Sequence, residues 1–137
     1  MITLEAALAR ATALKTKLAL SKVRLAQSFG TITPATTKAQ LVAAEATYDG
    51  YTAGGKVVTA FGNPYLSNGG GYAINSGVVQ FDSDPADPNV TNTIDAWWIE
   101  TAAGDIYDAG NFPGGIPMGA VGQAIPLTIE EIEGRNG

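Results

Sequence analysis

The stretch of residues 92–129 constrains the fold of this chain more than any other part of the sequence. It contains both tryptophans, alternating apolar and polar positions, and frequent glycine and proline, a pattern typical of strands joined by tight turns. Residues 91–101 are predicted to form the longest strand, and residues 103–105 a hairpin turn into a strand at 106–112. Seventeen glycines and only 15% charged residues fit a β-rich domain that buries much of its surface.

Further strands are expected on both sides of this stretch, at a spacing typical of a sandwich or jelly roll. They are predicted at residues 17–28, 56–61, 72–74, 78–81, 116–118 and 123–133. The first of these has a rival interpretation, because a helix continuing to about Leu25 also fits the sequence. The sequence therefore predicts a mainly β protein with an antiparallel β-sandwich or jelly-roll-like body.

Two helices complete the predicted architecture. Residues 3–15 have Thr3 as an N-cap and a narrow, alanine-rich apolar stripe suited to close packing on a sheet or partner. Residues 38–44 follow two threonines able to cap a helix, and Leu41 and Val42 are expected to face inward. The N-terminal helix should cover one part of the body, and the second helix should be short.

Length and composition narrow the possible function classes. At 137 residues the chain is expected to be one domain, with residues 1–16 as an N-terminal helix or arm and residues 17–137 as the sandwich body. Without histidine or cysteine, it lacks the residues of Ser-His-Asp and Cys-His catalysis, imidazole metal ligation and disulfides. No apolar run reaches the length of a membrane span, and residues 1–6 lack the features of a secretion signal. We expect no catalytic residue, no cofactor and no metal.

Charge is distributed unevenly along the chain. Residues 1–40 carry six basic residues and one acidic residue, whereas residues 41–137 carry two basic and twelve acidic residues. One interpretation is a solvated helix face with acidic loops. Another is complementarity, in which a basic arm with Arg10, Lys15 and Lys17 contacts the acidic body of a neighbour and fixes the register. Nucleic-acid binding is not expected, because the basic residues are few and no aromatic residues alternate with them.

An acidic loop is one candidate metal site. Asp82, Asp84 and Asp87 offer carboxylates of the kind that calcium prefers, on a turning backbone. Their spacing does not match the helix-flanked calcium loop, and the two prolines among them suit a plain surface turn. The glycine run at residues 69–71 is likewise expected to be a loop, because no lysine follows it as in a phosphate-binding loop.

A second acidic group raises the question of glycosidic acid–base chemistry. Glu100, Asp105 and Asp108 could supply the paired carboxyl groups that such enzymes use. An acid with a raised pKa also needs a desolvated cleft, and nothing in the sequence predicts one around these residues. An enzyme acting on cell-wall polysaccharide is therefore the least favoured hypothesis.

The two tryptophans are the strongest candidates for a packing surface. Trp97 and Trp98 are neighbours on a predicted strand, so their side chains should point to opposite faces. One indole is expected in the core, and the other needs an aromatic partner, a neighbouring subunit or a sugar ring. The segment of Tyr48 and Tyr51 is expected to pack near this strand. Binding of a sugar would also require nearby amides, for which the candidates are Asn63, Asn68 and Asn111.

Two segments are moderately distinctive, residues 47–51 (Thr-Tyr-Asp-Gly-Tyr) and residues 97–101 (Trp-Trp-Ile-Glu-Thr). More generic pieces accompany them at residues 22–28, Pro34, 43–46, 92–94, Gly104, Phe112, 117–118 and 122–127. Together, over about residues 17–130, they resemble a family of small proteins encoded in the structural-gene regions of tailed bacteriophages and prophages. The resemblance implies a non-enzymatic virion protein with a β-sandwich body, and it supplies no catalytic residues.

The motifs do not fix the role within the particle. We expect a capsid decoration or cement protein, made in the host cytoplasm and located in the virion. It should form a homo-oligomer and contact other virion proteins such as the major capsid protein, without nucleic-acid or membrane partners. The alternative is a tail or tail-fibre component that binds a host glycan or receptor. The expected interface residues are Arg10, Lys15, Lys17, Tyr48, Tyr51, Trp97 and Trp98.

Overall fold

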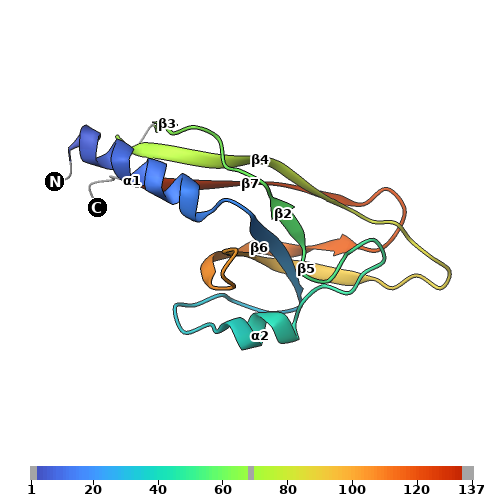
Figure 1. Cartoon of the computed structure of the whole chain (residues 1–137). Helices are drawn as coiled ribbons and strands as arrows, with labels where there is room; N and C mark the ends of the chain where they lie inside the picture. Colours follow the sequence, from blue (N-terminus) through green and yellow to red (C-terminus); the bar gives the residue numbers. More distant parts are fainter. Residues whose placement is uncertain (1–2, 68–69, 134–137) are drawn as a thin grey trace.

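Seven strands form two antiparallel sheets in the computed structural model, which describes residues 3–67 and 70–133 (Figure 1). The helices and strands are α1 (Leu4–Lys17), β1 (Ser21–Gln27), α2 (Lys38–Ala43), β2 (Lys56–Val58), β3 (Tyr65–Leu66), β4 (Tyr72–Asp82), β5 (Asn92–Glu100), β6 (Ile106–Met118) and β7 (Ala124–Glu133). One sheet has the order β2-β1-β5-β6 and the other the order β3-β4-β7. The predicted β-sandwich with an N-terminal helix and a short second helix is confirmed.

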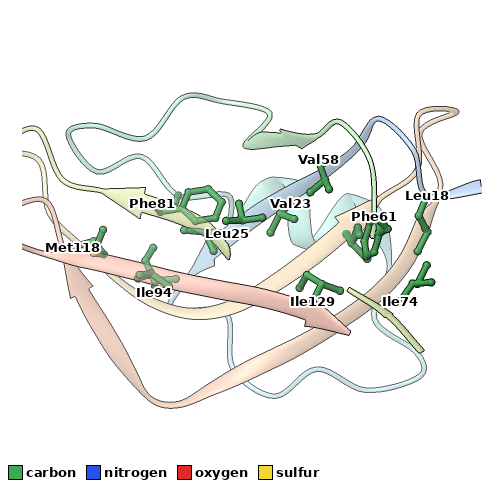
Figure 2. Packing of buried hydrophobic residues seen from close by; sticks show 14 of the residues in the cluster. Leu18, Val23, Leu25, Val58, Phe61, Ile74, Phe81, Ile94, Met118 and Ile129 are labelled. Carbon is green, nitrogen blue, oxygen red and sulfur yellow. The ribbon is translucent and has the colours of Figure 1, made fainter. Parts of the chain in front are cut away.

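The core lies between the two sheets (Figure 2). Alternating residues of β1 and β5 face this space, and Val23, Leu25, Ile94 and Ile99 are fully buried there. The facing sheet contributes Ile74, Phe81 and Ile129, and Phe61 after β2 and Met118 at the end of β6 complete the core. Each such side chain contributes about 1.5–3 kcal/mol of hydrophobic stabilisation when it leaves water. The alternation visible in the sequence is thus the periodicity of a buried strand face.

Helix α1 begins as predicted, with the Thr3 hydroxyl accepting a hydrogen bond from the Ala6 amide at 3.1 Å. Its buried residues are Ala7, Ala11 and Leu14, and the small alanines allow close packing on β4 and β7. Figure 1 shows this contact where those two strands extend past the four-stranded sheet. No helix in the described part of the chain is both long and apolar enough to cross a lipid bilayer.

The boundary between α1 and β1 differs from both interpretations of the sequence. The helix continues to Lys17, so the strand predicted at 17–28 starts too early and the rival helix to Leu25 is too long. Leu20 adopts a left-handed conformation with φ of 60°, which ends the helical path before the strand begins. The turn at Leu20 therefore sets this boundary. Neither the helical nor the strand periodicity of the sequence could locate it.

Helix α2 is capped by a reciprocal pair of hydrogen bonds. The Thr37 hydroxyl accepts from the Gln40 amide, and the Gln40 side chain accepts from the Thr37 amide. Leu41 is 1% exposed, as expected, but the inward prediction for Val42 is wrong, because Val42 is 41% exposed. Successive helical residues point about 100° apart, so a short helix on one face of a sheet rarely buries both.

The longest strand is β6 and not β5, contrary to the prediction. β5 has nine residues, whereas β6 has 13 and includes the short strand predicted at 116–118. The pairing register shifts between Ile94 and Ala96 of β5, because the glycine-containing segment of β6 opposite them has extra residues without a partner. β4 likewise joins two predicted strands through a register shift between Asn75 and Val78. Such bulges interrupt the sequence alternation without ending the strand.

Candidate functional site

The two tryptophans lie on opposite faces of β5, and both faces are covered by the chain itself. Trp98 is fully buried on the outer face of the four-stranded sheet, beside Ala26, Ala96 and Leu41 of α2. The Arg24 guanidinium lies 4.9 Å from the centre of the Trp98 ring. The partner expected for the second indole is therefore α2 with the loop before it, and Trp98 contributes no outer surface.

Trp97 faces the core between the sheets, where it is half-buried. Its indole occupies the space beside Gly110 of β6, which is its cross-strand partner. A Cβ atom at Gly110 would lie only 2.8–2.9 Å from three atoms of that indole. The ring and the glycine therefore fit each other, so Trp97 serves the packing of the sandwich.

Tyr48 and Tyr51 also stabilise the interior. Tyr48 is 1% exposed, and the half-buried Tyr51 ring stacks on Phe81 of β4 with their centres 6.1 Å apart. The Tyr51 hydroxyl accepts a hydrogen bond from the Leu25 amide and donates one to Glu45 at 2.8 Å. This segment thus contacts β1 and β4, and of the four aromatic residues expected at an interface, Tyr48 and Trp98 are internal.

A cluster of ionised side chains covers the outer face of the four-stranded sheet. Arg24 donates two hydrogen bonds to Glu45, at 2.8 and 2.9 Å, and one to Glu100 at 2.9 Å. Lys38 of α2 contacts the other oxygen of Glu100 at 2.5 Å. Burial by itself would raise the pKa of both glutamates, but these hydrogen bonds lower it overall. We call these four residues the Arg24 cluster, and it fastens α2 and its flanking loop to β1 and β5.

The acids considered for glycosidic chemistry have separate environments. Glu100 belongs to the Arg24 cluster, where its lowered pKa keeps it ionised and unsuited to donate a proton. Asp105 is exposed at the turn before β6. Asp108 lies opposite Ile99 on the core side of β6 and accepts a hydrogen bond from the Ala109 amide at 2.8 Å. The three carboxyl groups therefore have different partners and do not line one cleft.

The acidic loop after β4 is organised by a residue outside it. One oxygen of Asp49 accepts hydrogen bonds from the Ala86 and Val90 amides at 3.0 and 2.9 Å. The next residue, Gly50, has φ of 106°, and a Cβ there would lie 2.5 Å from the Asp84 amide nitrogen. Within residues 3–67 and 70–133, no three acidic side chains are placed to hold a metal ion. The Asp-Gly pair of the distinctive segment 47–51 thus has a structural role.

The amides considered for glycan binding are also engaged. Asn63 accepts a hydrogen bond from Lys15 at 2.8 Å. The Asn111 side chain accepts from the Ile32 amide and donates to the carbonyl oxygens of Gly30 and Asp95. Asn68, like Gly69 of the glycine run, lies outside the described residues. Two of the three amides therefore hold the chain's own loops and α1 in place.

Two of the three basic residues of α1 contact the chain's own sandwich. Lys15 bonds to Asn63, and the Lys17 ammonium lies 5.2 Å from the centre of the Tyr107 ring. Arg10 is exposed. Of the three basic residues expected at an interface, Arg10 and Lys17 are thus exposed, and Lys15 is half-buried.

An open groove separates β2 and β4, the strands at one side of the sandwich. It has a volume of about 450 Å³ and is lined by residues 56–60 and by β4. Val57 is 54% exposed and Val78 is 69% exposed beside it. β3 pairs with β4 only at Tyr72 and Ala73, so the rest of this edge of β4 has no described strand beside it. We call this the β2–β4 groove, and unpaired strand edges of this kind can add a strand from another chain.

Sequence reasoning missed most of the residues that organise these regions. Arg24 had a signal, since it is a charged residue between the apolar Val23 and Leu25, but its partners are 21 and 76 positions away. Asp95, whose two oxygens accept hydrogen bonds from the Phe29 and Gly30 amides, had none. The β2–β4 groove was also missed, because edge strands are defined by sheet order and not by local pattern.

The structure thus combines a strand, β5, whose two tryptophans are covered by the chain itself, the Arg24 cluster and the β2–β4 groove. Comparisons with known proteins give no further information on these features. No family model matches the sequence, no curated protein matches it, and no solved structure matches the fold.

Proposed function

We propose that this chain is a non-enzymatic structural protein of a bacteriophage particle, which decorates or cements the capsid. The observation that carries the proposal is the β2–β4 groove, where unpaired edges of both sheets flank two exposed valines. Exposed apolar side chains beside free backbone donors and acceptors are suited to contact with another protein. The partners we propose are a second copy of the chain and the major capsid protein.

The placement of the acidic side chains supports a non-enzymatic role. Glu45 and Glu100 are held by Arg24 and Lys38, and Asp49 is held by backbone amides. These carboxylates hold loops to the sandwich through hydrogen bonds and ion pairs. They are therefore poorly suited to exchange protons with a substrate. A rigid sandwich whose polar groups stabilise its own loops fits a particle component that must resist deformation.

The distribution of exposed groups supports association between copies. Arg10, Leu4 and Leu8 are exposed on α1, and the acidic loop after β4 lies at the opposite end of the sandwich (Figure 1). An approach of Arg10 in one copy to the acidic loop of the next would favour one orientation of neighbouring copies. Charge of this kind selects orientation, whereas the apolar groove supplies area.

The groove can be tested by placing charge on both of its valines. We expect Val57→Lys with Val78→Lys to fold normally and to lose self-association and binding to isolated capsid shells, because lysine on an edge strand opposes strand addition. Val121→Lys is the matched control, since Val121 is 85% exposed in the turn between β6 and β7. Native mass spectrometry and co-sedimentation give the readout. Unchanged association of the double variant would reject the groove as the interface.

Particle composition tests the wider proposal. Quantitative mass spectrometry of purified particles of the phage or prophage that encodes the chain should find it in the virion. A copy number close to that of the major capsid protein indicates decoration, whereas a few copies indicate a tail position. Absence from the particle would reject the proposal.

The alternative of glycan binding at a tail has less support. It needs an exposed aromatic platform. Among the described residues, Tyr65 is the one aromatic residue that is exposed and not half-buried or buried, at 36%. Its hydroxyl is already bonded to Glu130. Adsorption to host cells that is lost in Tyr65→Ala, with assembly intact, would restore this alternative.

A further inference from the structure

The seam between β6 and β7 contains carboxyl groups that the proposed function does not use. β6 is the last strand of the four-stranded sheet, and β7 is the last strand of the three-stranded sheet. Asp108 of β6 lies directly opposite the buried Ile99, so it shares that residue's inward face. Glu131 of β7 is two residues after the buried Ile129 and therefore also points inward. Both carboxyl groups therefore face the space between the two sheets.

The Glu131 carboxyl group is difficult to accommodate as an anion. Its Oε1 atom is buried and receives no hydrogen bond from the described chain. A buried charged oxygen without a donor is costly, whereas a protonated carboxyl group can donate to a neighbouring carboxylate. Burial first, then a hydrogen bond with Asp108 and repulsion from Asp108 and Glu133, raise the pKa of Glu131 to about 8. Geometry and charge both favour one proton held at this position.

The surroundings of the pair are acidic and aromatic. On β6, Tyr107 has a pKa raised first by burial and then by Glu131, Glu133 and Asp108. From α1, the Lys17 ammonium lies above the Tyr107 ring, and β4 places Ile74 and Tyr72 opposite Glu131 and Glu133. Within residues 3–67 and 70–133, the three ion pairs all belong to the Arg24 cluster. Among the described residues, no ion pair at the seam therefore compensates a second negative charge.

We propose that Glu131 keeps a proton at the seam, where its buried oxygen faces Asp108, and that release of this proton as the pH rises past neutrality loosens the end of the sandwich beneath α1. The folded state binds this proton more tightly than the unfolded chain does, because an exposed glutamate releases it near pH 4.3. The stabilisation is therefore complete at acidic pH and is lost as the pH rises towards the folded value. β6 and β7 belong to different sheets, so no ladder of backbone hydrogen bonds opposes their separation.

The composition of the chain makes this proton easy to observe. It has no histidine and no cysteine, so besides this pair only the α-amino group is expected to titrate between about pH 6 and 8.5. Side-chain carboxyl carbon shifts measured by NMR should show Glu131 titrating above about pH 7, instead of near the pH 4.3 of an exposed glutamate. An ordinary midpoint for Glu131 would overturn the proposal.

Hydrogen exchange tests the mechanical consequence. We expect protection of the amides at residues 106–109 and 130–133, corrected for intrinsic exchange, to fall by about tenfold or more between about pH 6 and pH 9. In Glu131→Gln the fall should disappear, because the neutral amide replaces the protonated acid. Asp105→Asn is the matched control, since Asp105 is an exposed carboxyl group at the turn before β6, and it should keep the wild-type response.

A second variant keeps the test decisive if Glu131→Gln fails to fold. Asp108→Asn removes the neighbouring charge but leaves Glu131 buried, so the Glu131 midpoint should move down from the wild-type value while staying above that of an exposed glutamate. An unchanged midpoint in Asp108→Asn would show that Asp108 does not help to hold the proton on Glu131. Equal seam protection at both pH values in the wild type would show that the charge does not loosen the structure.

Discussion

The molecule has two partly buried groups of carboxyl side chains, and they differ in what lies beside them. Glu45 and Glu100 receive hydrogen bonds from Arg24 on the outer face of the four-stranded sheet, where a lysine of α2 adds a second cation. Asp108 and Glu131 meet at the seam, where the described chain supplies no ion pair. Burial raises the carboxyl pKa in both places, and hydrogen-bonded cations reverse it in the first alone. The comparison teaches that burial sets the cost of a charge, while its partners decide whether the charge persists.

The largest effect should come from removing the cation that distinguishes the two groups. Arg24→Met leaves Glu45 and Glu100 without their main donor, so we expect a loss of about 3 kcal/mol in the free energy of unfolding. Urea unfolding at neutral pH measures this loss. Lys22→Met is the control, because Lys22 is exposed on the same strand. A loss in Arg24→Met no greater than that in the control would mean that the Arg24 cluster does not fasten α2 to the sheet.

The next effect concerns the sign of the pH dependence. The lowered pKa of Glu45 and Glu100 gives stability that is lost as the pH falls through their folded values, whereas the raised pKa of Glu131 gives stability that is lost as the pH rises. We therefore expect the stability maximum close to the ordinary carboxyl pKa, at about pH 4–5, with a decline as the pH rises further. Glu131→Gln should remove the alkaline decline and add about 1–2 kcal/mol at about pH 9, after allowance for solvent screening. Urea unfolding over a pH series measures both, and a decline that survives in Glu131→Gln contradicts the assignment.

A smaller effect is expected from the second cation of the Arg24 cluster. Lys38 contacts Glu100 and donates to the Gly104 carbonyl oxygen at 2.6 Å, but its side chain is 46% exposed. Lys38→Met should therefore cost about 0.5–1 kcal/mol, and it should raise the pKa of Glu100 so that acid destabilisation begins at a higher pH. Urea unfolding at about pH 4 and pH 7 separates these effects. If acid destabilisation begins at the same pH as in the wild type, Arg24 alone lowers the pKa of Glu100.

The smallest effect should be found at an acidic residue that belongs to neither group. Asp105 is exposed at the turn before β6, and its backbone carbonyl, not its carboxylate, accepts the Thr101 amide. Asp105→Asn should change the free energy of unfolding by about 0.5 kcal/mol or less at any pH. A larger change, measured by urea unfolding, would mean that an acidic residue outside the Arg24 cluster and the seam also affects stability strongly.

Much of the fold can be predicted from particular residues. Alternation around Trp97 and Trp98 placed one indole on each face of β5, and Thr3 and the alanines that follow it marked the start of α1. Boundaries were less accessible, since a left-handed Leu20 ends the path from α1 into β1 and bulges join the predicted pieces of β4 and β6. Helix and strand periods report which face of an element is apolar, and they do not report where a bulge continues it.

The sequence by itself determined the β-sandwich class, the opposite directions of the two indoles and the lack of histidine and cysteine chemistry. Only the tertiary structure decided what covers Trp98, which strands are left at the edges, and which acids acquire a cation. Alternation along a strand is a local property, fixed by the two-residue repeat of the backbone. The contacts of Arg24 with Glu45 and Glu100, and of Asp108 with Glu131, join positions far apart in the chain. Sheet order and register bring these residues together, so the balance of charge and burial at each group is set by the assembled fold.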